Sequence, residues 1–493
     1  MSLARLAAIA MLAMTAALAR PLETRAQDPA DAAQGAGERA EDGGDAAEDG
    51  GDTAEDAGDT AQDSGEAPPL LETHRRTPDY DALPVPGPDA GEVLLWIPRV
   101  ALAPVTLTLE YAVRRPIGAL VTVAEREGWM LQLADAFTWN GRRSGVVPTF
   151  ILAYGLQPGV GLVVFSNDDV ARGHSIHASA GFGGVDAFNG AASYTIFTSG
   201  NRVRVELRGE GARRPDRVFS DIGWNTVEAQ YRFRETWYAA SLALIADFWR
   251  ESRLSVRAGF DGHELDANGY AAFSDAPSLA EGIQTGRVLA PYGLASGYAA
   301  YRQRLELAID SREPEPAPGH GFRIEAYGEL AFDPGDPVAR RWVRYGATAG
   351  AFVDVGDRRV IGLWGLARFA DPLGSEPLVF TELVALGQES LLMQGFLRGQ
   401  LRGRSAVAAT LEYVYPVWTH LDGRVHLSTG NVFGEHLSDF RPERLRFSLG
   451  LGLATAGEPD SAFQITVAVG SAPLIRGASI ESVQLVIGSR QGI

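Results

Sequence analysis

From Gly145 to its end, the chain consists of short segments in which apolar and polar residues alternate, separated by Gly, Asp, Asn and Pro. Such alternation is typical of β-strands, because successive side chains point to opposite faces of a sheet. In residues 202–208 (RVRVELR), Val203, Val205 and Leu207 share one face, and three arginines and a glutamate share the other. A face this charged suits a hydrated barrel lumen, since a packed core cannot solvate it.

Seventeen segments of the chain fit this alternating pattern. Charged residues recur on their polar faces, which favours a membrane barrel over a soluble β-sandwich, in which the apolar side chains would point inward. Bacterial single-chain barrels have an even number of strands, so one segment is surplus, and we place the surplus among the first five. The segments are Val146–Tyr154, Val160–Ser166, Ser175–Gly183, Ala191–Ser199, Arg202–Gly209, Val227–Phe233, Trp237–Phe248, Arg253–Phe260, Tyr298–Ile309, Phe322–Phe332, Trp342–Val355, Val360–Phe369, Ala406–Tyr415, Arg424–Gly430, Leu445–Ala454, Phe463–Gly470 and Ile480–Ile487, and the recurring charges are Glu228, Arg232, Arg302, Arg304, Glu306, Glu325 and Glu329.

The first residues predict export. Arg5 precedes an apolar run from Leu6 to Leu18, and Ala17-Leu18-Ala19 offers a small-residue cleavage site, with a second possible cut after Ala26. This is the pattern of a cleaved signal peptide, which we assign to residues 1–27. No later apolar run reaches about 18 residues, so a place in the membrane requires a closed barrel. The chain has no cysteine, which excludes disulfides, thiol catalysis and a lipid anchor on an N-terminal cysteine.

Acidic residues are concentrated in one segment. Between Asp28 and Glu66 there are 14 acidic residues against one basic residue, which accounts for most of the net charge of −18. Four seven-residue repeats begin at Ala40, but every repeat contains glycine and none supplies a Leu, Ile or Val seam for a coiled coil. Residues 28–92, including the Pro-rich stretch, are predicted to be a disordered linker. A calcium-binding role is less favoured, because the spacing of a calcium loop is missing.

Residues 93–144 have a different character. Pro104 and Pro116 suit the first turn of short helices, and an apolar helical face follows. This face consists of Ile117, Leu120, Val121 and Ala124. Two readings remain open: a lead-in that lies at the periplasmic rim or in the lumen of the barrel, or an ordinary packed helix pair.

The stretch Met393–Trp418 combines two kinds of sequence. Residues 393–405 carry three glycines and the arginines Arg398, Arg402 and Arg404, which favours a flexible cationic loop. From Ala406 onward the residues alternate and end in aromatics, which predicts a strand with one apolar face.

A strand that follows such a loop resembles the BamA/TamA family of outer-membrane proteins, also called the bacterial surface antigen family. There a loop with an Arg-Gly-Phe/Tyr motif folds back into a β-barrel, and here Gln394-Gly395-Phe396 occupies that place. A family-like strand end is matched by residues 412–416 (EYVYP), and the next family strand by Asp422 to Phe433, which includes Ser428 and Gly430. The resemblance implies sixteen strands, five of them after the loop, and long extracellular loops at His263–Gly297 and Asp371–Ser405.

The chain departs from the family in two respects. Family members carry periplasmic POTRA modules before the barrel, and residues 93–144 are too few for one. In the family the loop arginine pairs with an aspartate on an inward-facing strand, whereas this chain has Gln394 and Ser428 at those positions. Replacing both partners leaves two neutral groups that still hydrogen-bond, which fits a retained loop fold, or a loop that has drifted because insertase work is no longer required. Arg398, Arg402 and Arg404 are candidates for substitute contacts to lumenal carboxylates, the other reading being that water hydrates them.

No enzymatic site is predicted. The Gly-x-Ser-x-Gly elbow of hydrolases is missing, and His174 and His177 lack a third ligand at zinc-like spacing, so we expect them in a loop. We therefore expect no catalytic residue, no metal and no cofactor. All 44 basic residues are arginine, and no basic stripe is interleaved with aromatics, so no nucleic-acid partner is expected.

The first and last strands predict a weak junction. Pro148 removes a hydrogen-bond donor from the first strand, and Gly477 and Gly488 bound the last. Exposed strand edges accept an added strand, and in the family lateral opening at this junction underlies insertion of other barrel proteins. We expect an all-β outer-membrane barrel at residues 145–493, in contact with outer-membrane lipids and with client outer-membrane proteins. The alternative is a passive channel or surface antigen without insertase activity.

Overall fold

A computed structural model describes residues 132, 135–198, 200, 202–225, 230–272, 274–312, 319–355, 359–387, 392–418, 421–455 and 464–488. The predictions of a signal peptide at 1–27 and a linker at 28–92, and most of the lead-in at 93–144, lie outside these residues.

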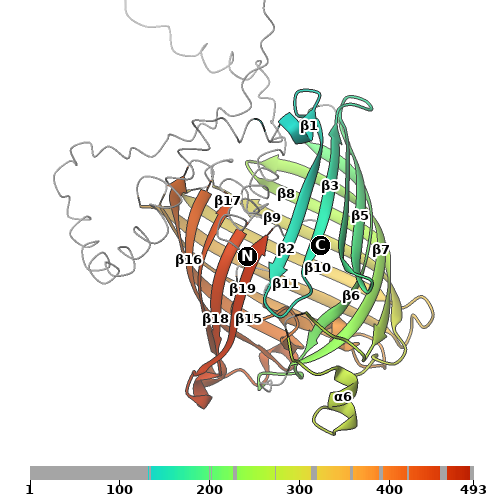
Figure 1. Cartoon of the computed structure of the whole chain (residues 1–493), viewed down its shortest axis with the longest axis vertical. Coiled ribbons are helices and arrows are strands. Elements are labelled where there is room, and N and C mark those ends of the chain that lie inside the picture. The colour runs from blue at the N-terminus through green and yellow to red at the C-terminus, as the bar shows by residue number, and fades with distance from the viewer. Residues whose placement is uncertain are drawn as a thin grey trace, which may run out of the picture. The chain divides into compact units, whose positions relative to one another are not determined.

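Sixteen antiparallel strands close into a barrel, in which each strand pairs with the next and the last pairs with the first (Figure 1). The predicted fold class is confirmed. The strands are β2 (Ser144–Ala153), β3 (Gly159–Asn167), β4 (His174–Gly184), β5 (Ala187–Phe197), β6 (Val203–Phe219), β7 (Tyr231–Trp249), β8 (Ser252–Asp266), β9 (Tyr298–Asp310), β10 (Gly321–Phe332), β11 (Arg341–Asp354), β12 (Val360–Pro372), β15 (Ser405–Trp418), β16 (Leu421–Phe433), β17 (Arg446–Thr455), β18 (Gln464–Ser471) and β19 (Ile480–Gly488).

The remaining described elements are short. β1 (Thr138–Trp139) forms a hairpin with the start of β2. β13 (Val384–Leu386) pairs with β14 (Leu401–Gly403) in a small sheet that is separate from the sheet of the barrel wall. The helix α6 (Leu279–Gln284) lies between β8 and β9, and single 3-10 turns are η2 (Phe380–Glu382), η3 (Glu435–Leu437), η4 (Pro442–Arg444) and η5 (Leu474–Arg476). Among the described residues, no helix has the length and apolar character needed to cross a membrane.

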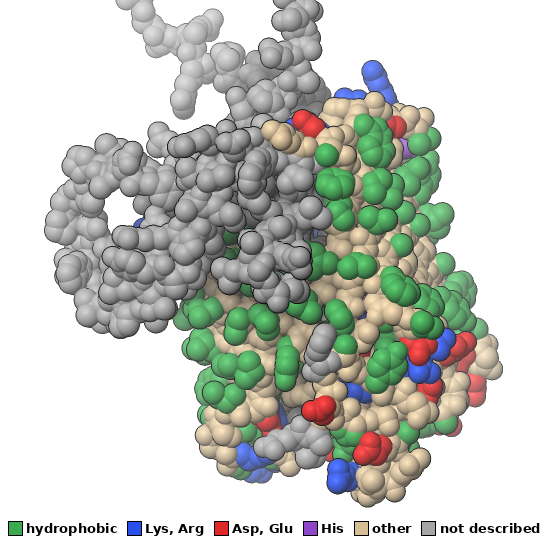
Figure 2. Space-filling model, in the orientation of Figure 1, with side chains coloured by type: hydrophobic (Ala, Val, Ile, Leu, Met, Phe, Trp, Pro, Cys, Tyr) green, Lys and Arg blue, Asp and Glu red, His purple; other side chains and the backbone are tan. Residues whose placement is uncertain are grey.

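The alternation along the strands separates an apolar outside from a charged inside. Leu207, Leu305 and Leu363 point outward and are 56%, 54% and 60% exposed, and Figure 2 shows apolar side chains spread over the outer wall. On the inner face, Arg204 pairs with Asp247 at 2.6 Å. A hydrated lumen accommodates such pairs, and an apolar exterior suits lipid.

One prediction about the strands is wrong. The surplus segment is Val227–Phe233, the sixth in order, and not one of the first five. Its described end belongs to β7, which continues through Arg234 and Glu235 to Trp249. The strand continues because its charges are paired: Arg234 contacts Asp266 at 2.8 Å, and Glu235 contacts Arg217 at 2.7 Å.

The long connections lie at one end of the barrel. Antiparallel strands place the β8–β9 and β12–β15 connections at the same end, and these are the two regions predicted to be long loops. At the opposite end, the turn between β7 and β8 has two residues, Arg250 and Glu251. Long loops at one end and short turns at the other are usual in outer-membrane barrels.

Candidate functional site: a loop inside the barrel

The connection between β12 and β15 is here called the plug, and its described residues, 373–387 and 392–404, fold into the barrel lumen. The plug side chains of Phe380, Leu392, Met393, Phe396 and Leu401 are fully buried. They belong to one apolar cluster with small inward-facing residues of the wall, among them Ala300, Ala331, Ala370 and Ala406. These alanines leave room for the plug. The expectation of a flexible loop at 393–405 is wrong, because this segment is packed.

The first anchor of the plug is the Glu382 carboxylate. Arg302 of β9 donates to both of its oxygens, at 2.9 and 2.7 Å, and Arg344 of β11 lies 3.2 Å from Oε2. Trp342 Nε1 donates to Oε2 at 3.1 Å, and the Tyr298 hydroxyl donates to Oε1. Four side chains from two strands thus converge on one carboxylate of the plug.

The charges around Glu382 form a network. Arg302 also binds both oxygens of Asp261, at 2.5 and 2.8 Å, and Arg302 and Arg344 share Glu329, at 3.1 and 2.5 Å. Burial opposes ionisation of Glu382, but the charges of Arg302 and Arg344 and the hydrogen bonds from Arg302 and Tyr298 hold the pKa of Glu382 well below its ordinary value. The plug is therefore held by an ionised carboxylate.

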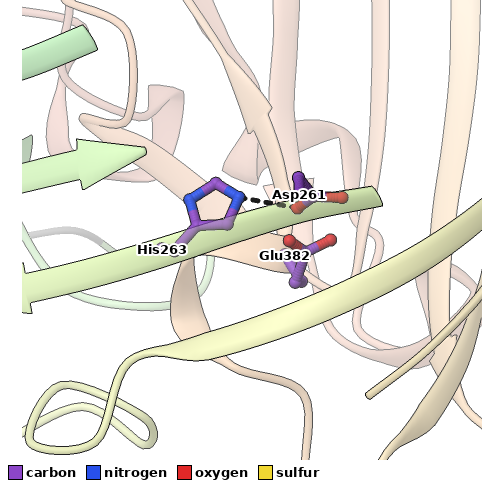
Figure 3. Close-up of side chains that lie close together, drawn as sticks. All are labelled: Asp261, His263 and Glu382. Carbon is purple, nitrogen blue, oxygen red and sulfur yellow. Dashed lines mark hydrogen bonds and ion pairs between the residues drawn. The ribbon is translucent and has the colours of Figure 1, made fainter. Parts of the chain in front are cut away.

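Asp261, His263 and Glu382 lie close enough together to suggest a metal site (Figure 3). Their donor atoms are already engaged, however. His263 contacts Glu235 through Nδ1 at 3.0 Å and Asp261 through Nε2 at 2.8 Å, and Arg302 bridges Asp261 and Glu382. A bound cation would have to displace the guanidinium, so the geometry favours an ion-pair network over a metal centre.

The second anchor is the Phe380 ring. It makes edge-on contacts with Phe219 of β6 and Phe233 of β7, with ring centroids 5.4 and 5.1 Å apart. Such contacts between buried aromatic rings add to the stabilisation from burial alone.

The third anchor contains the Gln394-Gly395-Phe396 motif. The Gly395 N–H donates to Ser448 Oγ of β17 at 2.8 Å, and a Cβ at Gly395 would overlap the backbone of Val469 in β18. The Phe396 ring lies over Gly470, and the Arg446 guanidinium is 5.7 Å from the ring centroid. Glycine is required at 395 by this close approach, and the motif docks on the C-terminal strands.

The two positions that replace the family's ion pair are both buried. Gln394 is in the plug, and Ser428 of β16 bonds with Thr410 at 2.7 Å. Ser428 is the register partner of Ser448, which receives the hydrogen bond from the plug. The motif therefore docks on β17 and β18 through neutral groups, one strand away from Ser428.

The arginines of the plug have different surroundings. Arg402 donates to the carbonyls of Gly399 and Phe380, both at 3.2 Å, and Arg404 pairs with Asp371 at 2.8 Å and Glu435 at 2.9 Å. The charge of Arg398 lies near Arg217 and Glu235. Arg404 thus pairs with two carboxylates, one on β12 and one at the start of η3.

The remaining predicted site residues lie on β16 or elsewhere in the wall. Gly430 packs against Ala408 of β15, close to the plug end of the strand, whereas Asp422 lies at the other end, opposite Pro416 and Ala454. Asp422 is thus not part of the plug site. His174 and His177 lie in β4 and not in a loop, and His174 Nδ1 is 2.5 Å from the Tyr194 hydroxyl.

Sequence reasoning missed Glu382 as an anchor. It is a single acidic residue among apolar neighbours, Phe380, Leu383 and Val384, in a stretch without strand periodicity. The sequence signal for a buried anion lay in the barrel wall, because the inward faces of the consecutive strands β9, β10 and β11 carry Arg302, Glu329 and Arg344. The polarity is the reverse of the family motif, because here the loop supplies the anion and the wall supplies the arginines.

The junction between β2 and β19, here called the seam, is short within the described residues. Among the described residues, which end at Gly488, three residue pairs join these strands, Ala153 with Val486, Leu152 with Ile487 and Ile151 with Gly488, whereas β2 and β3 share eight pairs. A further bond runs from the Tyr154 N–H to the Leu485 carbonyl at 2.9 Å. Among the described residues, Pro148 lies in the part of β2 that β19 does not reach. Weak closure at the seam stays a prediction.

Comparison with known proteins gives the fold an identity. No family model and no curated protein matches the sequence. BamA from Haemophilus ducreyi lacking POTRA domains 1-3 matches with a TM-score of 0.50 and 16% identity, over 70% of this chain and 70% of that chain. CdiB from Escherichia coli matches with a TM-score of 0.44 and 15% identity, over 70% and 62% of the chains. The chain is thus an outer-membrane-type β-barrel with the fold of the BamA barrel.

Proposed function

We propose that this barrel assists the insertion of other outer-membrane proteins by opening at the seam. The single observation that carries the proposal is the junction of β2 and β19, which three pairs join in the part of the chain that the structure describes. An incoming strand gains main-chain hydrogen bonds from an exposed strand edge, so a junction with few bonds is the part of the wall that opens at least cost. The proposal includes contact with lipids and with client barrel proteins, and it includes no enzymatic activity.

The filled lumen favours this function over a passive channel. Three anchors hold the plug across the lumen, on β6 and β7, on β9 and β11, and on β17 and β18. A permanently open pore has no need of such a plug.

A cysteine pair across the seam tests the proposal, because the natural chain has no cysteine. Ala153→Cys with Val486→Cys would lock the seam on oxidation, since these residues are register partners. Val163→Cys with Ser179→Cys is the matched control inside the continuous β3–β4 ladder. Purified full-length variants in liposomes would receive an unfolded client barrel, and its heat-modifiable migration on a gel would report insertion.

Oxidation is expected to stop insertion by the seam pair and to leave the control pair active, and reduction is expected to restore the first. Equal insertion with the seam locked would overturn the proposal. A steady conductance in planar bilayers without client insertion would favour the passive channel.

A further inference from the structure

Beyond the seam itself, the turn between β2 and β3 is bound to distant parts of the barrel. This turn, residues 154–158, follows directly after the three seam pairs. The Gln157 N–H donates to Asp216 Oδ2 of β6 at 2.7 Å. Its side chain donates to the Gly183 carbonyl of β4 at 2.8 Å and accepts from the Ala272 N–H of the β8–β9 connection at 3.0 Å. One residue next to the seam thus joins three other elements.

The Asp216 carboxylate is built into place. The pairing of β6 with β7 is irregular between Arg214 and Arg217, and such a bulge re-aims a side chain. Pro215 is tolerated at this irregularity, because no ladder hydrogen bond is required of it there. Asp216 is 1% exposed and accepts from Arg214 Nε at 2.9 Å and from its terminal nitrogen at 2.7 Å. Because Arg214 neutralises the buried carboxylate of Asp216, the remaining hydrogen-bond acceptor capacity of this carboxylate is available to the Gln157 N–H.

The backbone beneath the turn is fixed as well. Arg232, which is 1% exposed, donates to the Asp216 carbonyl at 3.1 Å. Gly155 has φ +78°, and a Cβ there would lie 3.3 Å from the Arg232 guanidinium and 3.5 Å from Leu397 of the plug. The turn therefore rests on β6, β7 and the plug together.

We propose that Asp216 and Gln157 form a latch that keeps β2 beside β19. Up to Gly488, where the described residues end, β2 is held to β19 by three pairs, and it is held to β3 by eight, so an opening seam would carry the β2–β3 turn away from Asp216. The latch bonds break only when the turn moves, and they stabilise the closed seam without belonging to it. The importance of the latch for insertion rests on the proposed function, whereas its effect on closure does not.

Hydrogen exchange of the seam amides in detergent-solubilised full-length protein tests the latch without any client. Gln157→Ala removes two of the three bonds of Gln157, and Asp216→Asn removes the charge that Arg214 and the turn share. Glu210→Gln is the matched control, because Arg208 and Glu210 form the same pair of neighbours on β6, at 3.0 and 2.7 Å, without contact to the turn.

Exchange in residues 151–154 and 485–488 is expected to accelerate about tenfold to a hundredfold in the latch variants, since one hydrogen bond to a charged group, or two hydrogen bonds between neutral groups, contributes about that factor. Exchange in β15 and β16 is expected to stay unchanged, as is exchange throughout Glu210→Gln. Unchanged seam exchange in folded latch variants, or equal acceleration in all strands, would overturn the latch. If Asp216→Asn fails to show heat-modifiable folding, Gln157→Ala decides the question alone.

Discussion

Glu382→Gln is the substitution that tests the plug most sharply. The glutamine keeps the size of the side chain but loses the charge that Arg302 and Arg344 surround, and it presents an amide donor to groups that are themselves donors. Removing one member of a buried ion pair costs about 3–5 kcal/mol, because the other member stays buried without its partner. At about 1.4 kcal/mol for each factor of ten, the equilibrium between docked and undocked plug would shift by about two to three and a half powers of ten.

Glu376→Gln is the control for this change. Glu376 lies in the same plug, accepts a hydrogen bond from the Tyr292 hydroxyl at 2.8 Å and is exposed, so its loss contributes about 1 kcal/mol or less. Single-channel recording in planar bilayers measures the result. Glu382→Gln is expected to open the lumen frequently, and Glu376→Gln is expected to behave as the natural chain does. If Glu382→Gln stays as closed as the natural protein, Glu382 is not the anchor.

Three further predictions follow from the same contacts. The pKa of Glu382 is held well below its ordinary value, so acid should leave the plug docked down to the usual titration range of glutamate, about pH 4.3, and should open the plug only below that pH. Conductance recorded against pH checks this prediction, and openings that begin near about pH 6 would contradict it. Phe396→Ala removes a fully buried ring and is expected to destabilise the docked plug by about 3–5 kcal/mol. Proteolysis within residues 392–401 should become faster in this variant, whereas Leu289→Ala, at an exposed loop position, should leave the rate unchanged. Gly488→Val places a side chain against the Phe150 carbonyl at φ +139° and should abolish the protection of the seam amides from exchange, and retained protection would refute the seam geometry.

Most of the wall was predictable from the sequence, because a strand that faces lipid on one side and water on the other must alternate. Leu207 and its neighbours on β6 follow this rule without tertiary information. The rule fails in the first part of β7, which includes Arg234 and Glu235, since ion pairs to other strands replace the alternating pattern there.

The plug was predictable only in part. The motif at Gln394 to Phe396 was found because a resemblance points to it, and it docks on β17 and β18. The Glu382 anchor and the latch at Asp216 were not found, because each depends on residues that are far apart in the chain. Asp216 meets Gln157 across 59 positions, and Glu382 meets Arg302 across 80. Local periodicity carries no information about such contacts.

The plug and the seam both depend on one claim, which is that the outer face of the barrel wall contacts lipid and the inner face contacts water. A single cysteine introduced at each position from 203 to 208, labelled with a fluorophore in liposomes, would be exposed in turn to brominated lipids and to a water-soluble quencher. We expect lipid quenching at Val203, Val205 and Leu207 and aqueous quenching at Arg204, Glu206 and Arg208. Lipid quenching at the arginine positions, or aqueous quenching at all six, would contradict the account.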